Sequence, residues 1–193
     1  MAYLAFALYA FVSSVTPGPA NVAIFGRAAQ SGFRAVLPFV TGVVGGFLVV
    51  LICSEALAAL GVALAGPFYL GLKAVGSLYL VYLAWQLWAN ADAAQHADES
   101  MAKGLGAGFL VHVTSFKAWL FPLVAFTTFA PGEGVTAAVI PVVIFWLCAV
   151  VSHLLWAAGG GALHANLSPR MLRIVNRTSA VLLAGLVVYT LLA

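Results

Sequence analysis

Charged residues are scarce in this chain of 193 residues. Only 7% of the residues are Asp, Glu, Lys or Arg, whereas 64% are hydrophobic. A soluble domain has about 25% charged residues, so this chain lacks the polar surface that would keep a globule of its size in water. The composition therefore excludes a soluble enzyme, a nucleic-acid-binding protein and a disordered chain, and it predicts an integral membrane protein.

Cysteines and clustered basic residues are also scarce. Cys53 and Cys148 lie inside apolar runs, where a free cysteine acts as a small hydrophobic residue, so we expect neither a disulfide nor a metal site. The formal net charge of +3 comes from basic residues spread between hydrophobic runs, which gives no patch for nucleic acid. No Lys or Arg precedes Arg27, so we expect the first apolar run to be a retained span rather than a cleaved leader. These residues imply no cofactor.

Long hydrophobic runs dominate the chain. A helix needs about 20 mainly apolar residues to cross a membrane, and six stretches are predicted spans on this basis. They are Tyr3–Phe25, Pro38–Leu60, Phe68–Trp88, Leu105–Phe129, Val135–Ala158 and Thr178–Ala193. Because the runs are continuously apolar rather than alternating, they predict an all-α bundle of six transmembrane helices and not a barrel.

The basic residues indicate the orientation of these spans. The loops between spans one and two, three and four, and five and six lie on one side of the membrane. They hold Arg27, Arg34, Lys103, Arg170, Arg173 and Arg177. The opposite side has only Lys73, which lies within the third apolar run. Positively charged loops face the cytoplasm, so we expect both termini on the non-cytoplasmic side.

The sequence contains a weak internal repeat. When it is shifted by 98 positions, residues Phe11–Thr16 lie over Phe109–Thr114, with Phe, Val and Thr matched. Three spans in each half is an odd number, so the second half must be inverted relative to the first. We therefore expect a single membrane domain over 1–193, with repeat one at about 1–88, a cytoplasmic linker at about 89–103 and repeat two at about 104–193.

The matched segments interrupt spans one and four near their middle. Thr16-Pro17-Gly18-Pro19 removes two backbone donors, and Thr114-Ser115-Phe116-Lys117 places a positive charge near mid-depth. An opened helix leaves N–H groups at one end, which attract a carboxylate, and C=O groups at the other, which attract an ammonium group. Because paired broken helices mark transporter sites, these breaks predict a site for a zwitterionic amino acid. The alternative is a structural kink whose polar groups are satisfied by neighbouring helices.

The predicted substrate-binding residues lie in the two breaks or directly beside them. They are Thr16, Pro17, Gly18, Pro19, Asn21, Thr114, Ser115 and Lys117. A lysine near the bilayer centre costs about 2.5–3.5 kcal/mol, so we expect Lys117 to face protein or water. There it would either balance a substrate carboxylate or hold the broken helix in shape.

Three further polar residues within the apolar runs are candidates for gating or coupling. Glu55 and Lys73 lie equally far from the turn between spans two and three. We expect them at one depth as an ion pair, either a structural clamp or an outer gate. His112 precedes Lys117 on span four and is a candidate for proton handling, with a packing role as the alternative.

The segment Thr16-Pro17-Gly18-Pro19-Ala20-Asn21, followed by Arg27, Gly32 and a glycine-containing second span, resembles the LysE/RhtB family of bacterial amino-acid exporters. Members commonly carry Asn-Pro-Lys-Ala in the second break, where this chain has Ser115-Phe116-Lys117-Ala118. The resemblance covers most of the chain. It implies export of an amino acid or related small metabolite across the bacterial inner membrane, by alternating access and driven by the proton gradient.

The residues also leave other readings open. A metal-ion exporter would share this architecture, but Glu55 is the single acidic residue within a predicted span. An intramembrane enzyme would need a nucleophile beside a base, for which Ser14 and His112 are the nearest pairing. The four-residue spacing of Gly42 and Gly46 suits close helix packing and equally a homodimer.

Overall fold

The computed structural model describes residues 2–60, 101–129, 134–166 and 168–192, together with positions 74, 77, 78, 81, 82, 84, 85, 88 and 89. Every secondary-structure element in this part of the chain is an α-helix, which confirms the all-α prediction. The helices are α1 (Ala2–Val15), α2 (Pro19–Ser31), α3 (Phe33–Ala59), α5 (Met101–Val113), α6 (Phe116–Phe129), α7 (Val135–Asn166) and α8 (Pro169–Leu192). The predicted third span, Phe68–Trp88, and the linker at 89–103 lie largely outside the described residues.

Two of the described helices are long and apolar enough to cross a membrane by themselves. α3 and the stretch Val135–Leu163 of α7 each contain an 18-residue window with a mean hydropathy of 2.5. α5 and α6 together qualify as a third candidate, bent by 53° at the break between them, and α1 contains a shorter apolar helix. The described residues therefore give two or three candidate spans, and the total of six stays a prediction.

Several helix ends differ from the predicted spans. α3 begins at Phe33 and α8 at Pro169, each ahead of its predicted span, and α7 continues through Gly159–Gly161 to Asn166. The predicted spans were set by the thickness of the hydrocarbon core, which limits the membrane-crossing part of a helix and not its full length. A helix continues beyond that core wherever its backbone hydrogen bonds and packing partners persist.

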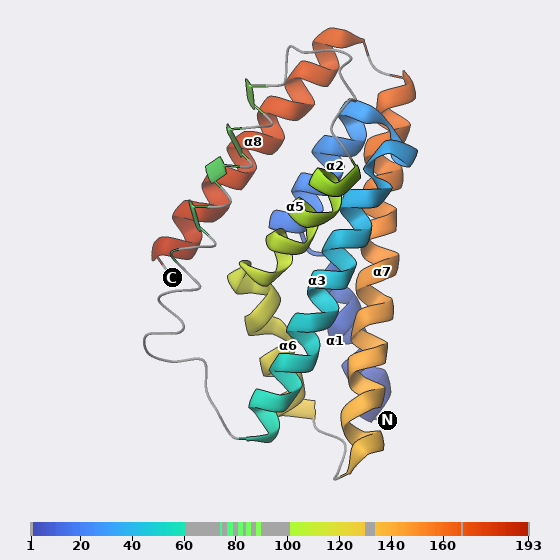
Figure 1. The fold of residues 1–193 in the computed structure, drawn as a ribbon, viewed down its shortest axis with the longest axis vertical. Coiled ribbons are helices and arrows are strands. Elements are labelled where there is room, and N and C mark those ends of the chain that lie inside the picture. Colours follow the sequence, from blue (N-terminus) through green and yellow to red (C-terminus); the bar gives the residue numbers. More distant parts are fainter. Residues whose placement is uncertain are drawn as a thin grey trace.

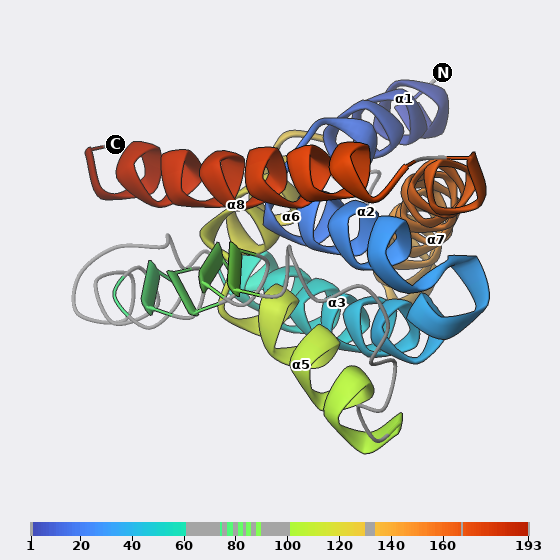
Figure 2. The same cartoon turned by 90° about the horizontal axis from the view of Figure 1, so that it is seen from above.

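Each interrupted pair of helices packs along an uninterrupted one. The long helices α3 and α7 run side by side (Figure 1), with α1 and α2 in succession along α7 and α5 and α6 in succession along α3. α8 packs against α2 at the outside of the bundle (Figure 2). The two interrupted pairs meet where α1 contacts α6, so their breaks are brought together.

Glycines bring α3 and α5 together backbone to backbone. A Cβ atom added to Gly42 would collide with the backbone of Leu105, and one added to Gly108 would collide with the backbone of Phe39. Small residues four positions apart are typical of closely packed membrane helices. The spacing of Gly42 and Gly46 therefore serves packing within the chain.

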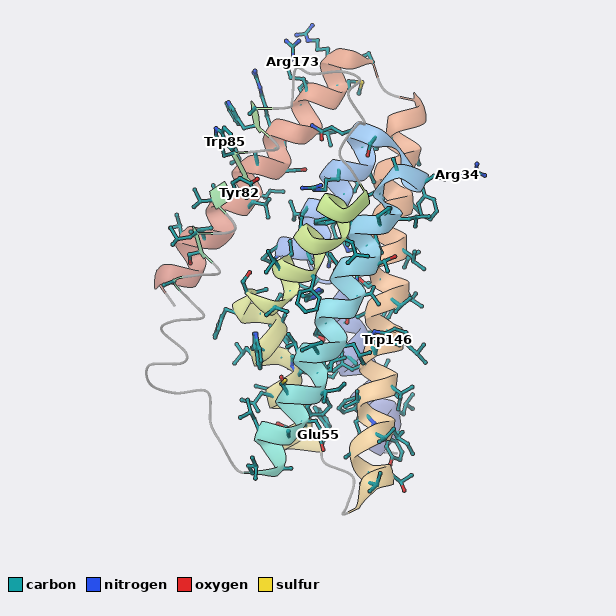
Figure 3. The ribbon with its side chains drawn as sticks, in the orientation of Figure 1. Arg34, Glu55, Tyr82, Trp85, Trp146 and Arg173 are labelled. Carbon is teal, nitrogen blue, oxygen red and sulfur yellow. The ribbon has the colours of Figure 1, made fainter. Side chains whose placement is uncertain are left out.

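Charged side chains lie toward opposite ends of the molecule. Arg34 and Arg173 lie toward one end, and Glu55 lies toward the other (Figure 3). The amino terminus lies at the end nearer Glu55 (Figure 1). The molecule therefore has a basic end that is remote from its amino terminus.

Candidate functional site

The first break separates α1, which ends at Val15, from α2, which begins at Pro19. Pro17 and Pro19 lack the backbone N–H that a continuous helix would use. Gly18 between them is extended, with φ −157° and ψ 176°. Pro19 lies in the first turn of α2, where a helix needs no N–H partner. The predicted interruption of the first helix is therefore present.

The carbonyl groups that end α1 accept hydrogen bonds from side chains. Asn21 Nδ2, on α2, donates to the Ser14 carbonyl at 2.8 Å and to the Thr16 carbonyl at 3.0 Å. Its side chain is only 3% exposed. One amide therefore replaces two of the helical bonds that the break removes.

α7 supplies two more donors to the same end of α1. Ser152 Oγ donates to the Ser14 carbonyl at 2.8 Å, and Trp156 Nε1 donates to the Val15 carbonyl at 3.2 Å. Backbone polar groups inside a membrane must be satisfied by protein or by a water-filled cavity. These bonds let the helix stay open without exposing its carbonyls to lipid.

The second break, between α5 and α6, forms without a proline of its own. Thr114 Oγ1 donates to the Leu110 carbonyl at 2.7 Å, and Trp119 Nε1 donates to the Val113 carbonyl at 2.8 Å. α1 ends at Val15 and α5 at Val113, which are the positions that the shift of 98 superimposes. Both helices therefore break at the same point of the repeated segment.

Lys117 links the two breaks. From the first turn of α6, its Nζ donates to the Thr16 carbonyl oxygen at 2.7 Å. A Cβ atom on Gly18 would lie 3.0 Å from Lys117 Cδ and 3.1 Å from Nζ, so Gly18 leaves room for the lysine. Nζ also lies 5.5 Å from the centre of the Phe121 ring, within the range of a cation–π interaction. The ammonium is thus held between the two broken helices.

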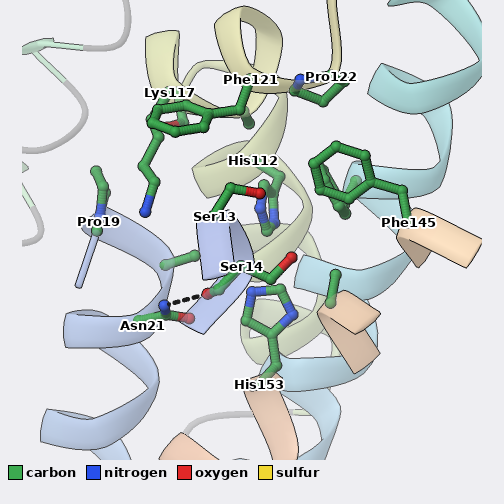
Figure 4. Close-up of a pocket in the computed structure, with 16 residues that line it drawn as sticks. Ser13, Ser14, Pro19, Asn21, His112, Lys117, Phe121, Pro122, Phe145 and His153 are labelled. Carbon is green, nitrogen blue, oxygen red and sulfur yellow. Dashed lines mark hydrogen bonds between the residues drawn. The ribbon is translucent and has the colours of Figure 1, made fainter. Parts of the chain in front are cut away.

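A cavity of about 40 Å³ lies between the breaks (Figure 4). Its polar lining consists of Ser13, Ser14, Asn21, His112, Ser115, Lys117 and His153, and the rest of its lining consists of Gly18, Pro19, Ala20, Phe47, Ala118, Phe121, Pro122, Phe145 and Ala149. A cavity of this size has room for a few water molecules. A few convergent polar groups on apolar and aromatic walls are typical of a small-molecule site.

Two buried histidines from different helices lie against each other in the cavity lining. The ring centroids of His112, on α5, and His153, on α7, are 5.1 Å apart, with the rings inclined at 74°. His112 Nδ1 lies 3.0 Å from the Val43 carbonyl oxygen. A carbonyl only accepts, so this nitrogen carries the proton. The His112 ring also stacks on Phe47, with centroids 4.6 Å apart.

Two buried polar atoms of the lining have no hydrogen-bond partner among the described residues. They are Asn21 Oδ1 and His153 Nδ1, and each side chain is 3% exposed. Leaving a buried polar group unpaired costs about 1–3 kcal/mol, and each such group calls for an explanation. Both residues line the same cavity, where a bound molecule could supply the missing partners.

Residues 11–193, which contain both breaks and the whole cavity lining, match the family of LysE type translocators. The chain belongs to this family. Among its curated relatives is the cysteine/O-acetylserine efflux protein of Escherichia coli (strain K12), 30% identical over 188 residues that cover 96% of this chain and 93% of the relative. The same-named protein of Klebsiella pneumoniae is 30% identical over 193 residues, covering 96% and 92%. That of Salmonella typhimurium is 29% identical, covering 96% and 93%. No solved structure matches.

Most of the residues predicted to bind substrate lie at the cavity of this translocator, but three do not. Gly18, Pro19, Asn21, Ser115 and Lys117 line it, as does the coupling candidate His112. The carbonyl oxygen of Thr16 accepts hydrogen bonds from Lys117 and Asn21. The hydroxyl of Thr16 donates to the Val12 carbonyl at 2.6 Å. Pro17 is exposed and Thr114 bonds within α5, and neither lines the cavity.

The predicted gating pair is separate from this cavity. Glu55 is half-buried on α3 and does not line the cavity. Figure 3 shows it toward the end of the translocator that is remote from Arg34. Lys73 lies outside the described residues, so the ion pair stays a prediction.

α7 contributes cavity residues that sequence reasoning did not select. His153 and Phe145 both line the cavity, and neither is among the residues that the sequence predicts for substrate binding, gating or coupling. The available signal was a polar pair, Ser152-His153, inside an otherwise apolar run. Because α7 is apolar on all faces, its pattern does not tell which face meets α1.

The two alternative chemistries depend on side-chain groupings that can be compared with the described residues. Ser14 Oγ donates to the Ala10 carbonyl at 2.6 Å and is not directed at His112 as an activated nucleophile would be. In the same part of the chain, no group of three or more His, Cys, Asp or Glu side chains could hold a metal ion.

Proposed function

We propose that this translocator exports a small amino acid across the bacterial inner membrane as a secondary transporter. Membership of the LysE type translocators and the names of the relatives support the transport class. The contact between Lys117 and Thr16 carries the proposal, because it puts a positive charge beside a polar cavity between two broken helices. Transporters of this construction bind their substrates between such helices, near the midplane of the membrane.

The substrate carboxylate binds at Lys117. An ammonium group has three donors, of which the Thr16 carbonyl accepts one. The amino end of α2 has no side-chain cap, and its first-turn residues Ala20 and Asn21 line the cavity. The backbone N–H groups of this turn add to the positive field that an anion meets.

The substrate ammonium binds at Asn21 Oδ1. The carbonyl end of α1 was the expected ammonium site, but side chains of α2, α6 and α7 already donate to those carbonyls. Asn21 Oδ1 is a buried acceptor without a partner in the described structure. The amide nitrogen of the same residue shares the Thr16 carbonyl with Lys117. The acceptor and the lysine therefore lie close together, as the adjacent charges of an α-amino acid require.

Transport proceeds by alternating access. Six spans form two inverted repeats, 1–88 and 104–193, and the equivalent break positions at Val15 and Val113 support this arrangement. The cavity of about 40 Å³ holds only a few water molecules, so the broken helices move apart to admit an amino acid. The proton gradient drives export with His112 as the proton-handling residue, and Glu55 with Lys73 forms the outer gate. The basic end faces the cytoplasm, and both termini lie on the opposite side.

The test is an efflux screen in proteoliposomes. Vesicles are loaded with single labelled amino acids, including L-cysteine, O-acetyl-L-serine and L-serine, and efflux is followed with and without an imposed pH gradient. We expect efflux of at least one amino acid above empty vesicles, and faster efflux with the gradient. Efflux of none of them would refute the proposal, and efflux that ignores the gradient would refute its proton coupling. A parallel assay with divalent metal ions tests the alternative cargo.

A further inference from the structure

The cavity has a second polar side, which the two charged groups of an amino acid leave unused. Lys117 and Asn21 lie on one side of the cavity, and His112 and His153 lie on the other (Figure 4). Ligands that share an α-amino acid backbone would differ from one another on the histidine side. The histidines would therefore contact the side chain of the substrate, which is the part that differs between amino acids.

The two histidines are not equivalent. His112 is fixed by its bond to the Val43 carbonyl and by stacking on Phe47. His153 packs its ring against His112, but its buried Nδ1 has no partner in the part of the chain that the structure describes. A neutral imidazole nitrogen can donate or accept, depending on the tautomer. His153 is thus oriented by its neighbour and still able to bind a polar atom.

We propose that His153 sets the side-chain specificity of export, with its Nδ1 hydrogen-bonding an oxygen or sulfur atom at the γ position of the transported amino acid. This inference rests on the proposed function, because it assumes that an amino acid backbone occupies the Lys117 side. Phe145 also lines the cavity, and its bulky ring favours a short side chain on the histidine side. The favoured substrates are therefore short amino acids with a polar γ atom, and the disfavoured ones are aliphatic amino acids of equal size.

The physical basis is the difference between a satisfied and an unsatisfied buried group. A substrate with a polar γ atom pairs with His153 Nδ1, whereas a methyl group at that position leaves the nitrogen buried and unpaired. Sites built to hydrogen-bond a substrate group reject the isostere that lacks it. The cost of one unpaired buried group corresponds to a preference of about 5- to 100-fold.

L-Serine and L-2-aminobutyrate provide a matched pair, because they differ by a hydroxyl against a methyl group. The efflux rates of both are measured from proteoliposomes at equal low loading, and their ratio is the readout. We expect the native translocator to prefer serine about 5- to 100-fold. His153→Phe and His153→Leu remove the nitrogen and should bring the ratio close to one, while His153→Gln should restore part of the preference.

Ser54→Ala is the matched control. Ser54 on α3 also has a buried, unpartnered polar atom among the described residues, but it does not line the cavity. Its removal should leave the ratio unchanged. Efflux of 2-aminobutyrate by the His153 variants shows that they are folded.

Two results would overturn the role of His153 while leaving the proposed function intact. One is that the native translocator exports amino acids but shows equal efflux rates for serine and 2-aminobutyrate. This result does not depend on the folding of any variant. The other is a His153→Phe or His153→Leu protein that keeps the native ratio. Absence of amino acid efflux from the native protein would instead refute the proposed function, and the inference with it.

Discussion

Lys117 and Thr16, which are 101 positions apart in the chain, are joined by a hydrogen bond of 2.7 Å from the lysine Nζ to the threonine carbonyl oxygen. The donor lies at the amino end of one interrupted helix, and the acceptor lies at the carboxyl end of another. The lysine therefore acts as a cap across two helices. Its position beside the cavity makes the same ammonium available to an anionic group of a ligand.

Replacement of Lys117 by Ala should abolish export while the protein still inserts into the membrane. The substitution removes the charge proposed to bind the carboxylate, and hydrogen bonds to charged groups contribute about 1.5–3 kcal/mol each. Efflux from loaded proteoliposomes measures the effect, with the amount of inserted protein determined in parallel. Arg34→Ala removes an exposed charge far from the cavity and should export normally. Native efflux rates in Lys117→Ala would show that the lysine is only structural.

Replacement of Asn21 by Leu should destabilise the protein. The Ser14 and Thr16 carbonyls would each lose one of two donors, keeping Ser152 and Lys117 respectively. The cost is about 0.5–1.5 kcal/mol for each hydrogen bond lost. Thermal unfolding in detergent should show a clear decrease in Tm. Asn21→Asp keeps one carboxyl oxygen at the Oδ1 position but loses both N–H donors, so it should be destabilised as well. An unchanged Tm in both variants would mean that the first break does not depend on this amide.

Two glycines on α3, three positions apart, should respond oppositely to alanine. At Gly42 a new Cβ atom would collide with the backbone of Leu105, whereas at Gly45 it would meet nothing within 4 Å. Gly42→Ala should therefore lower the free energy of unfolding by about 1–3 kcal/mol. Gly45→Ala should raise it by about 0.5–1 kcal/mol, because alanine favours the helix. Equal stabilities in a denaturation experiment would contradict the close packing of α3 on α5.

The two ends of the molecule should be reached from opposite sides of the membrane. After replacement of Cys53 and Cys148 by Ser, single cysteines are placed at Arg34, which is exposed, or at Val135, which is 80% exposed. A membrane-impermeant maleimide should label Val135→Cys in intact cells and Arg34→Cys only after permeabilisation, because positive loops face the cytoplasm. The reverse pattern would invert the proposed topology.

The sequence predicted the helical class and the positions of both breaks. The two prolines in Thr16–Pro19 lack backbone N–H donors, so the loss of helical hydrogen bonds there can be predicted from the sequence alone. The second break was less evident, because Phe116 stands where related exporters commonly have proline. The break is present nonetheless, and Trp119 Nε1 donates to the Val113 carbonyl at the end of α5. Thr114 Oγ1 adds a second donor to the Leu110 carbonyl, which also accepts the Thr114 N–H. A break can thus persist when its proline is absent, provided that other donors reach the exposed carbonyls.

The partners of the first break and the far side of the cavity could not be predicted. Ser152, Trp156 and His153 reach their positions through the way α7 packs on α1. An α7 helix that is apolar all round has no polar stripe to reveal which face is inward. Helix ends could not be predicted either, since hydropathy locates the hydrocarbon core and not the last hydrogen bond of a helix.

The satisfied end of α1 has a consequence for biosynthesis. Lys117, Ser152 and Trp156 follow their carbonyl acceptors by 101, 138 and 141 positions, so a growing polypeptide enters the bilayer before these donors have been translated. Until then the nearby Asn21 is the side-chain donor for the Ser14 and Thr16 carbonyls, and the Val15 carbonyl must be satisfied by water or by the insertion machinery. The amino-terminal half of the chain should therefore be degraded when it is expressed alone. It should accumulate when the carboxyl-terminal half is expressed from a second gene in the same cell.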